Sequence, residues 1–244
     1  MHNRIKDIYA LFAALALLAV LFLSPDARAD GHAGVSAVSP ENAWRFRVFL
    51  DDREIGYHHF YLAGEGEHRQ LRSEARFEVK LLFVKVFDYE HENLETWSGN
   101  CLQSIRSRTD SNGDLYSVNG RRADDAFRVV ANEGAAALPE CVMTFAYWNP
   151  AILDADRLLN SQTGQLAEVT VRAHGPETLD IGPHRVPAEK YTIESTEGPI
   201  RLWYAPGSRH WLALEAELES GRTLRYVPLV LPWNAVGETR LALN

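Results

Sequence analysis

The sequence contains little of the residues and signals that mark several common classes of protein. Among its 244 residues there are only 2 Cys, 16 Gly and 11 Pro, which excludes a disulfide-dense miniprotein and collagen. Hydrophobic residues make up 46% of the chain, so a disordered chain is also excluded. Basic residues are fewer than acidic ones: the chain has 25 Lys and Arg and 33 Asp and Glu, which gives a formal net charge of -8. A nucleic-acid backbone binds basic surfaces, so we expect no nucleic-acid partner.

Motifs of the common enzyme classes are absent as well. The sequence has no G-x-S-x-G, no P-loop and no G-x-G-x-x-G after a predicted strand. Residues 91–95 begin like the zinc-protease motif H-E-x-x-H, but Glu95 replaces the second histidine and the surrounding pattern is not helical. These absences disfavour an enzyme. We therefore predict no catalytic residues, no cofactor and no metal ion.

Only one long apolar run is present, and it lies at the N-terminus. Arg4 and Lys6 precede an apolar stretch over residues 8–23, and the triplet Ala27-Arg28-Ala29 follows it. The stretch is shorter than the roughly 20 residues that a membrane-spanning helix needs, and this order of features is typical of a cleaved secretory signal peptide. We expect cleavage after Ala29 and a periplasmic or secreted protein that is not transmembrane. Retention as an uncleaved anchor is the alternative.

Export bears on the two cysteines, Cys101 and Cys141. In an oxidising compartment two thiols tend to form a disulfide if the geometry permits it, and a disulfide is the interpretation that we favour. Two separately buried thiols are the alternative, since cysteine often packs as a small hydrophobic residue. A catalytic pair is disfavoured, because no C-x-x-C spacing is present.

Four segments follow from composition. Residues 1–29 form the predicted signal peptide, and residues 30–41 are small and turn-prone without periodicity, which predicts a flexible lead. Residues 42–227 form a single predicted all-β domain. Residues 228–244 form a predicted C-terminal tail, because Pro228 and Pro232 interrupt an apolar run there.

A period of two dominates the predicted domain. Residues 71–83 place Leu, Ser, Ala, Phe and Val on one face and Arg, Glu and Lys on the other, which a strand achieves and a helix does not. This segment is longer than the usual strand of about five or six residues, which favours a strongly curved sheet. Asn-Gly pairs at 112–113 and 119–120 can supply tight hairpin turns. The pattern predicts an all-β protein with a large curved antiparallel sheet, either a half-barrel or an open barrel.

One segment departs from this pattern. Asn149 can cap a helix and Pro150 can occupy its first turn. The sequence therefore predicts one short helix near residues 149–159, which would plug one end of the sheet.

The aromatic segment around this predicted helix carries a family resemblance. Residues 145–150 (Phe-Ala-Tyr-Trp-Asn-Pro), 158–164, 89–97 and 202–204 resemble landmarks of a family of exported bacterial proteins known as domain of unknown function 6134. The resemblance covers about residues 44–226 and implies no activity, ligand or catalytic residue. In outline it is similar to other exported half-barrel families, which implies lipid-like ligands by association only.

Polar side chains at every second position form the strongest candidate site. They lie in the strand predicted over residues 87–97 and so share one face. That face is a solvated outer face, a ligand-lining belt, or a metal or acid–base site in which His91 and Glu95 act together. Side chains of a strand over residues 55–62 would face the same space if the two strands are close. The candidates on these strands are Tyr57, His59, Tyr61, Tyr89, His91, Asn93, Glu95 and Trp97.

Aromatic clusters provide the remaining candidates. Such residues either pack in the core or line an apolar cavity, and a curved sheet can do either with its concave face. The candidates of this kind are Phe145, Tyr147, Trp148 and Trp203.

These observations favour an exported protein that binds an apolar or amphiphilic, lipid-like molecule without catalysis. The first alternative is a hydrolase or isomerase that uses His91 and Glu95, helped by Tyr89. The second is a non-catalytic envelope assembly factor that contacts other envelope proteins through an exposed patch.

The signal-peptide interpretation has a direct test. Expressed in a bacterium with a general export pathway, the protein should be recovered from the periplasm with Asp30 as its first residue, because the small-x-small triplet ends at Ala29. Intact mass spectrometry of the periplasmic fraction measures this. A membrane-bound product that retains Met1 would contradict it.

Overall fold

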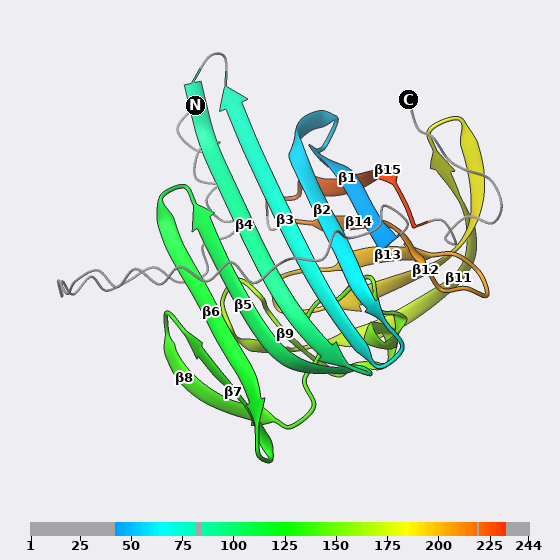
Figure 1. Cartoon of the computed structure of the whole chain (residues 1–244). Helices are drawn as coiled ribbons and strands as arrows, with labels where there is room; N and C mark the ends of the chain where they lie inside the picture. Colours follow the sequence, from blue (N-terminus) through cyan, green and yellow to red (C-terminus); the bar gives the residue numbers. More distant parts are fainter. Residues whose placement is uncertain (1–41, 82–83, 219, 233–244) are drawn as a thin grey trace.

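The alternating sequence folds into one large antiparallel sheet in the computed structural model, which describes residues 42–81, 84–218 and 220–232. Within these residues, 13 strands form the main sheet and two more form a small one. The predicted all-β class with a large, unclosed antiparallel sheet is confirmed (Figure 1). The elements are β1 (Ala43–Leu50), β2 (Arg53–Glu65), β3 (His68–Leu81), β4 (Val84–Ser98), β5 (Cys101–Ser111), β6 (Asp114–Ala123), β7 (Ala126–Ala131), β8 (Gly134–Pro139), the 3-10 helix η2 (Pro150–Asp154), β9 (Arg157–Leu159), β10 (Leu166–Glu168), β11 (Thr170–Ile181), β12 (His184–Glu194), β13 (Ile200–Tyr204), β14 (Trp211–Glu217) and β15 (Thr223–Val230).

Two meanders make up the main sheet. Strands β1 to β8 follow one another in space as in sequence, and so do β11 to β15. Pairing of β1 with β15 joins the two meanders, so that β8 and β11 are the two edges of the sheet. Residues 140–169 connect these edges and contain η2, β9 and β10. We call this connection the strap.

The strap packs against the inner, concave face of the sheet. The backbone N–H of Leu102 donates to the carbonyl of Val142 at 2.9 Å, and the hydroxyl of Tyr204 donates to the carbonyl of Tyr147 at 2.9 Å. These bonds tie the strap to β5 and to β13, which belong to different meanders. The hydrophobic core lies between the strap and the sheet, where Leu158 and Leu159 of β9 are fully buried.

The hairpin signals in the sequence have two different meanings. Asn112 and Gly113 both have positive φ, 61° and 95°, and form the tight turn between β5 and β6 as predicted. Residues 119–120 do not turn but lie inside β6. A Cβ atom on Gly120 would lie 2.5 Å from the ring of Phe127, so this glycine serves close packing instead of a turn.

The predicted helix is shorter than expected. A single 3-10 turn covers Pro150–Asp154, with the side chain of Asn149 accepting a hydrogen bond from the N–H of Ala151 at 3.2 Å. The helix prediction for residues 155–159 is wrong. Residues Arg157–Leu159 form β9, because strand pairing with β10 lets two adjacent leucines be buried together.

The predicted C-terminal boundary of the domain also shifts. Strand β15 continues to Val230, beyond the predicted end of the domain at residue 227. Pro228 fits into this strand where the register between β1 and β15 changes, which is a position where a missing N–H is tolerated. The predicted signal peptide, the predicted lead over residues 30–41 and the end of the predicted tail lie outside the described residues. Across the described part of the chain, no helix has the length and apolar character to span a membrane.

The predicted disulfide is present in the structure. Cys101 at the start of β5 is bonded to Cys141 at the start of the strap, with their Cα atoms 4.8 Å apart. The bond fixes one end of the strap to the sheet.

Removing this cross-link should lower stability. The bridge closes a loop with a sequence separation of 40, which corresponds to about 4 kcal/mol in the loop-entropy treatment. We expect the double variant Cys101→Ser/Cys141→Ser to lose free energy of unfolding of this order in urea denaturation. Wild-type protein under reducing conditions is the control and should lose a similar amount. A loss below about 1 kcal/mol in both would contradict a stabilising role.

Candidate functional site

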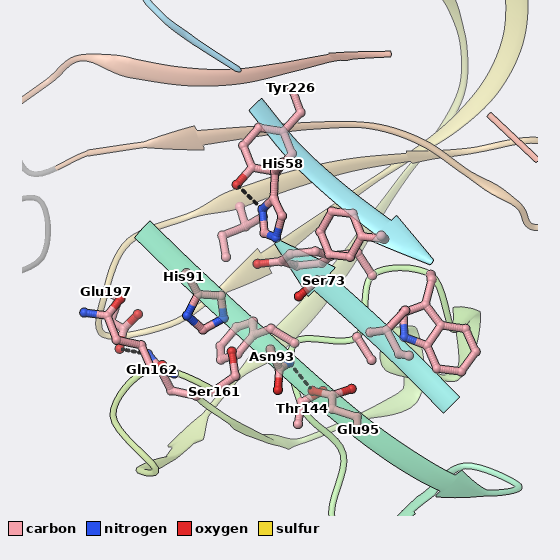
Figure 2. Close-up of a pocket in the computed structure, with 18 of the residues that line it drawn as sticks. His58, Ser73, His91, Asn93, Glu95, Thr144, Ser161, Gln162, Glu197 and Tyr226 are labelled. Carbon is pink, nitrogen blue, oxygen red and sulfur yellow. Dashed lines mark hydrogen bonds between the residues drawn. The ribbon is translucent and has the colours of Figure 1, made fainter. Parts of the chain in front are cut away.

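A cavity of about 170 Å³ lies between the strap and the inner face of the sheet. Polar side chains from β2, β3, β4, β15 and the strap surround it (Figure 2). The residues that line it are His58, Phe60, Leu71, Ser73, Tyr89, His91, Asn93, Glu95, Thr144, Phe145, Ala146, Tyr147, Trp148, Asn160, Ser161, Gln162, Glu197, Ile200 and Tyr226.

The polar belt of β4 faces this cavity and not the solvent. His91, Asn93 and Glu95 all line it and are 6%, 6% and 2% exposed. The interpretation of this belt as a solvated outer face is therefore wrong. The reason is the strap, which covers the inner face and whose Gln162 accepts a hydrogen bond from the hydroxyl of Tyr89 at 3.0 Å.

The residues of β2 that face the cavity are not the odd-numbered ones that were predicted. Tyr57, His59 and Tyr61 do not line the cavity and lie on the outer face, where the hydroxyl of Tyr61 donates to Glu74. His58 takes the inward position instead. It lies opposite Ala75 of β3, which in turn lies opposite His91 of β4, and directly paired residues share one face. The prediction that these three odd-numbered residues face the same space as His91 is therefore wrong.

A bulge accounts for this error. The register between β1 and β2 shifts where Val48 pairs with Gly56 and Phe49 pairs with Glu54, which leaves Ile55 without a partner. The inward positions are even-numbered beyond that point. Gly56 marks the bulge, because its φ is 150° and an added Cβ would lie 1.9 Å from a backbone oxygen of Arg76. An isolated glycine inside a strand pattern is the sequence signal for such a bulge.

The aromatic candidates separate into three groups. Phe145, Tyr147 and Trp148 of the strap line the cavity. Trp97 lies behind its wall, with its ring edge-on to Trp148 at 5.6 Å. Trp203 does not reach the cavity, since it belongs to a separate buried cluster on the other face of β13.

Several lining residues were not among the site candidates predicted from the sequence. Thr144, Asn160, Ser161 and Gln162 belong to the strap, which lacks periodicity, and Glu197 lies in the turn between β12 and β13. Their positions depend on contacts between distant segments. One example is the bond that the hydroxyl of Ser107 donates to the carbonyl of Ser161.

Glu95 is a buried carboxyl group with hydrogen-bond donors at both oxygens. The amide nitrogen of Asn93 donates to Oε1 at 2.8 Å, and the indole N–H of Trp97 donates to Oε2 at 3.0 Å. Burial raises the pKa of Glu95, while these donors and Thr144 act in the opposite direction. Burial has the larger effect.

The buried His91 and the half-buried His58 also line the cavity, and both are held in the neutral form. Burial lowers the pKa of His91 to about 4, and burial followed by the charges of His91 and His59 lowers that of His58. Each histidine has one hydroxyl partner through Nδ1. His91 contacts Thr109 at 2.8 Å and His58 contacts Tyr226 at 3.1 Å (Figure 2 shows the second bond).

Four lining residues carry a buried polar atom that has no hydrogen-bond partner in the structure. These atoms are His58 Nε2, Asn93 Oδ1, Thr144 Oγ1 and Trp148 Nε1. Buried polar groups in proteins are almost always paired with protein, water or ligand. The cavity wall therefore offers hydrogen bonds to an occupant.

Metal binding and a second hollow offer less for a ligand than this cavity does. Among the residues that the structure describes, no group of three His, Cys, Asp or Glu side chains is arranged to hold a metal ion. A larger hollow of about 670 Å³ lies over the outer face of β2 to β6. Charged residues of its wall pair with one another there, as Arg76 and Glu90 do at 3.1 Å.

The buried state of His91 predicts a pH dependence of stability. The unfolded chain binds a proton near pH 6.5, whereas the folded protein binds it only near pH 4. The free energy of unfolding should therefore fall as the pH drops from 6.5 through 4, by up to roughly 3 kcal/mol from this residue. Urea denaturation across this range should show a shallower fall for His91→Gln than for wild type. His68→Gln, which alters an exposed histidine of β3, is the control, and identical profiles for wild type and His91→Gln would contradict the assignment.

Comparison with known proteins places this geometry in a family. No curated protein matches the chain. A crystal structure of a beta-barrel-like protein of domain of unknown function DUF1849 from Brucella abortus is similar in fold, with a TM-score of 0.57 and 9% sequence identity over 78% of this chain and 95% of that one. The family model described as Domain of unknown function (DUF6134) matches residues 46–229, which include the whole cavity wall. The chain belongs to the DUF6134 family.

Proposed function

We propose that the protein is exported and binds a small amphiphilic molecule, or one end of a longer lipid-like molecule, in the cavity under the strap without converting it chemically. The single observation that carries this proposal is the cavity wall itself. Aromatic and aliphatic side chains alternate there with buried polar atoms that have no protein partner. Small-molecule sites combine apolar walls with fixed polar groups, and the more polar wall of this cavity suits an amphiphilic ligand better than a purely apolar one.

The volume of the cavity limits the size of the ligand. Sites for drug-sized ligands measure roughly 300–1,000 Å³, whereas this cavity measures about 170 Å³. An apolar cavity of about 150 Å³ holds one benzene molecule. The cavity therefore suits one small ring or the end of an alkyl chain, and the rest of a longer ligand would extend past its mouth.

Two features support export. The N-terminal order of basic residues, apolar run and small-x-small triplet is that of a signal peptide. The disulfide between Cys101 and Cys141 is of the kind that forms and persists in oxidising compartments such as the periplasm. Together these two features support the proposed periplasmic location.

A hydrolase or isomerase is the second candidate, because His91 and Glu95 line the same cavity. The arrangement of their partners favours binding over catalysis. Both oxygens of Glu95 accept bonds from Asn93 and Trp97, so this carboxylate does not orient His91. Thr109, the hydroxyl partner of His91, is not among the residues that line the cavity, whereas a nucleophile must reach its substrate.

The proposal is tested by identifying a compound bound to the purified protein and by a substitution that places a larger side chain in the cavity. Protein purified from the periplasm should release a small amphiphilic compound on organic-solvent extraction followed by mass spectrometry. The variant Ser73→Leu places a larger side chain into the cavity, since Ser73 lines it and is 3% exposed. We expect this variant to release at least about tenfold less of the compound, because the added volume competes with the ligand.

Ser208→Leu is the matched control, because Ser208 is exposed in the turn between β13 and β14. It should retain the compound at the wild-type level. Thermal unfolding verifies that Ser73→Leu is folded, and Ala146→Val fills the same cavity if it is not. Empty extracts from wild type, or equal extracts from Ser73→Leu and wild type, would contradict the proposal. Turnover of the extracted compound by the wild-type protein would favour the enzyme instead.

A further inference from the structure

The unpartnered polar atoms of the cavity wall are deeply buried, and they differ in the hydrogen bonds that they can make. Asn93, Thr144 and Trp148 are 6%, 2% and 5% exposed. Asn93 and Trp148 each have a side-chain polar atom without a partner. The hydroxyl of Thr144, which interacts with the carboxyl group of Glu95, keeps hydrogen-bonding capacity for an occupant. Such atoms lose their water on burial and gain nothing in return unless an occupant bonds to them. Their chemistry therefore describes the polar group of the occupant.

The required group must both donate and accept hydrogen bonds. The amide nitrogen of Asn93 is directed to Glu95 at 2.8 Å, so the free atom Oδ1 is an acceptor and needs a donor. The free Nε1 of Trp148 is a donor and needs an acceptor. The hydroxyl of Thr144 can do either. A group that only accepts or only donates would leave one of these atoms unpaired.

The charges around the cavity exclude an anionic group. None of the described residues that line it is Lys or Arg. Its two histidines, His58 and His91, are neutral at pH 7 because burial lowers their pKa. Glu95 and Glu197 are the acidic members of the wall. A buried carboxylate or phosphate would have no cation among the lining residues to pair with and would face these carboxyl groups, which is costly. The nearby guanidinium of Arg69 does not line the cavity, since it lies over the ring of Trp148 and donates to the carbonyl of Gly99.

A cationic group fits little better. The oxygens of Glu95 already accept hydrogen bonds from Asn93 and Trp97. Glu197 is exposed and accepts a hydrogen bond from Asn160 at 2.9 Å. A primary ammonium has no acceptor for the N–H of Trp148, and a quaternary ammonium has no donor for Asn93.

We infer that the occupant is an uncharged molecule whose buried polar group is a hydroxyl or a primary amide, joined to a small apolar body. Both groups donate and accept hydrogen bonds. The apolar body would lie against the side chains of Phe60, Leu71, Phe145 and Ile200. This inference rests on the proposed function, which it refines by excluding free fatty acids, phosphates and amines as the buried end.

Four probes of nearly equal size and shape test this. Benzyl alcohol, benzoate, benzylamine and toluene fit the volume and differ in the charge and hydrogen bonding of one substituent. Binding to the full purified protein, stripped of co-purifying compounds, is measured at pH 7.5 by titration calorimetry or ligand-observed NMR. We expect benzyl alcohol to bind at least about tenfold more tightly than each of the other three.

A matched pair of variants locates the effect. Thr144→Val removes a hydroxyl from the cavity wall while keeping the shape of the side chain. It should weaken the binding of benzyl alcohol about fivefold to tenfold and leave the binding of toluene unchanged. Thr192→Val removes a buried hydroxyl that is bonded to His174 outside the cavity, and it should change neither.

The outcomes separate this inference from the proposed function. If benzoate or benzylamine binds more tightly than benzyl alcohol, or if Thr144→Val leaves the four affinities unchanged, the inference is overturned while the proposed function stands. If no probe binds and the solvent extract of native protein is empty, the cavity holds only water and both are overturned.

Discussion

The structure depends on one constraint, which is that a curved sheet left unclosed must cover its concave face. The main sheet has two edges, β8 and β11, and the chain segment that joins them also covers the inner face. The disulfide fixes one end of this strap, and hydrogen bonds to β4, β5 and β13 hold the rest of it against the sheet. The cover is apolar where Leu158 and Leu159 are buried and polar where it meets the belt of β4. A cavity remains between the two polar surfaces.

The same cover determines the electrostatics of the cavity. Once the strap is in place, His91 and Glu95 lose contact with water and His58 loses part of it. Burial shifts the pKa values of all three towards the uncharged form. Hydroxyl, amide and indole groups then provide the polarity of the wall, without lysine or arginine among the lining residues. A site of this kind discriminates by the match of donors and acceptors and by the absence of net charge. This explains how a chain with a formal net charge of -8 can still offer a pocket whose buried polar groups are mostly uncharged.

The sequence was sufficient for the class of fold and for seven of the 19 residues that line the cavity, for identifiable reasons. Alternation over residues 71–83 and 87–97 is local, so the strands and the shared face of His91, Asn93 and Glu95 could be predicted. Whether that face is solvated or lines a cavity could not be predicted, because this depends on the strap that covers it. The parity of β2 could not be read by counting alone, because the bulge at Ile55 changes it, although Gly56 was a visible signal. The path of the strap across the sheet could not be predicted, since it follows from contacts such as that of Tyr89 with Gln162, which are 73 positions apart.

The central claim is that the cavity holds an uncharged ligand through Asn93, Thr144 and Trp148. The most direct measurement is a high-resolution crystal structure of protein purified from the periplasm without added ligand. The account predicts continuous electron density inside the cavity for a compact apolar group, ending in a polar atom within hydrogen-bond distance of Asn93 Oδ1 and Trp148 Nε1. Isolated water peaks alone at these atoms, or a cavity closed by the side chains of the strap, would contradict it.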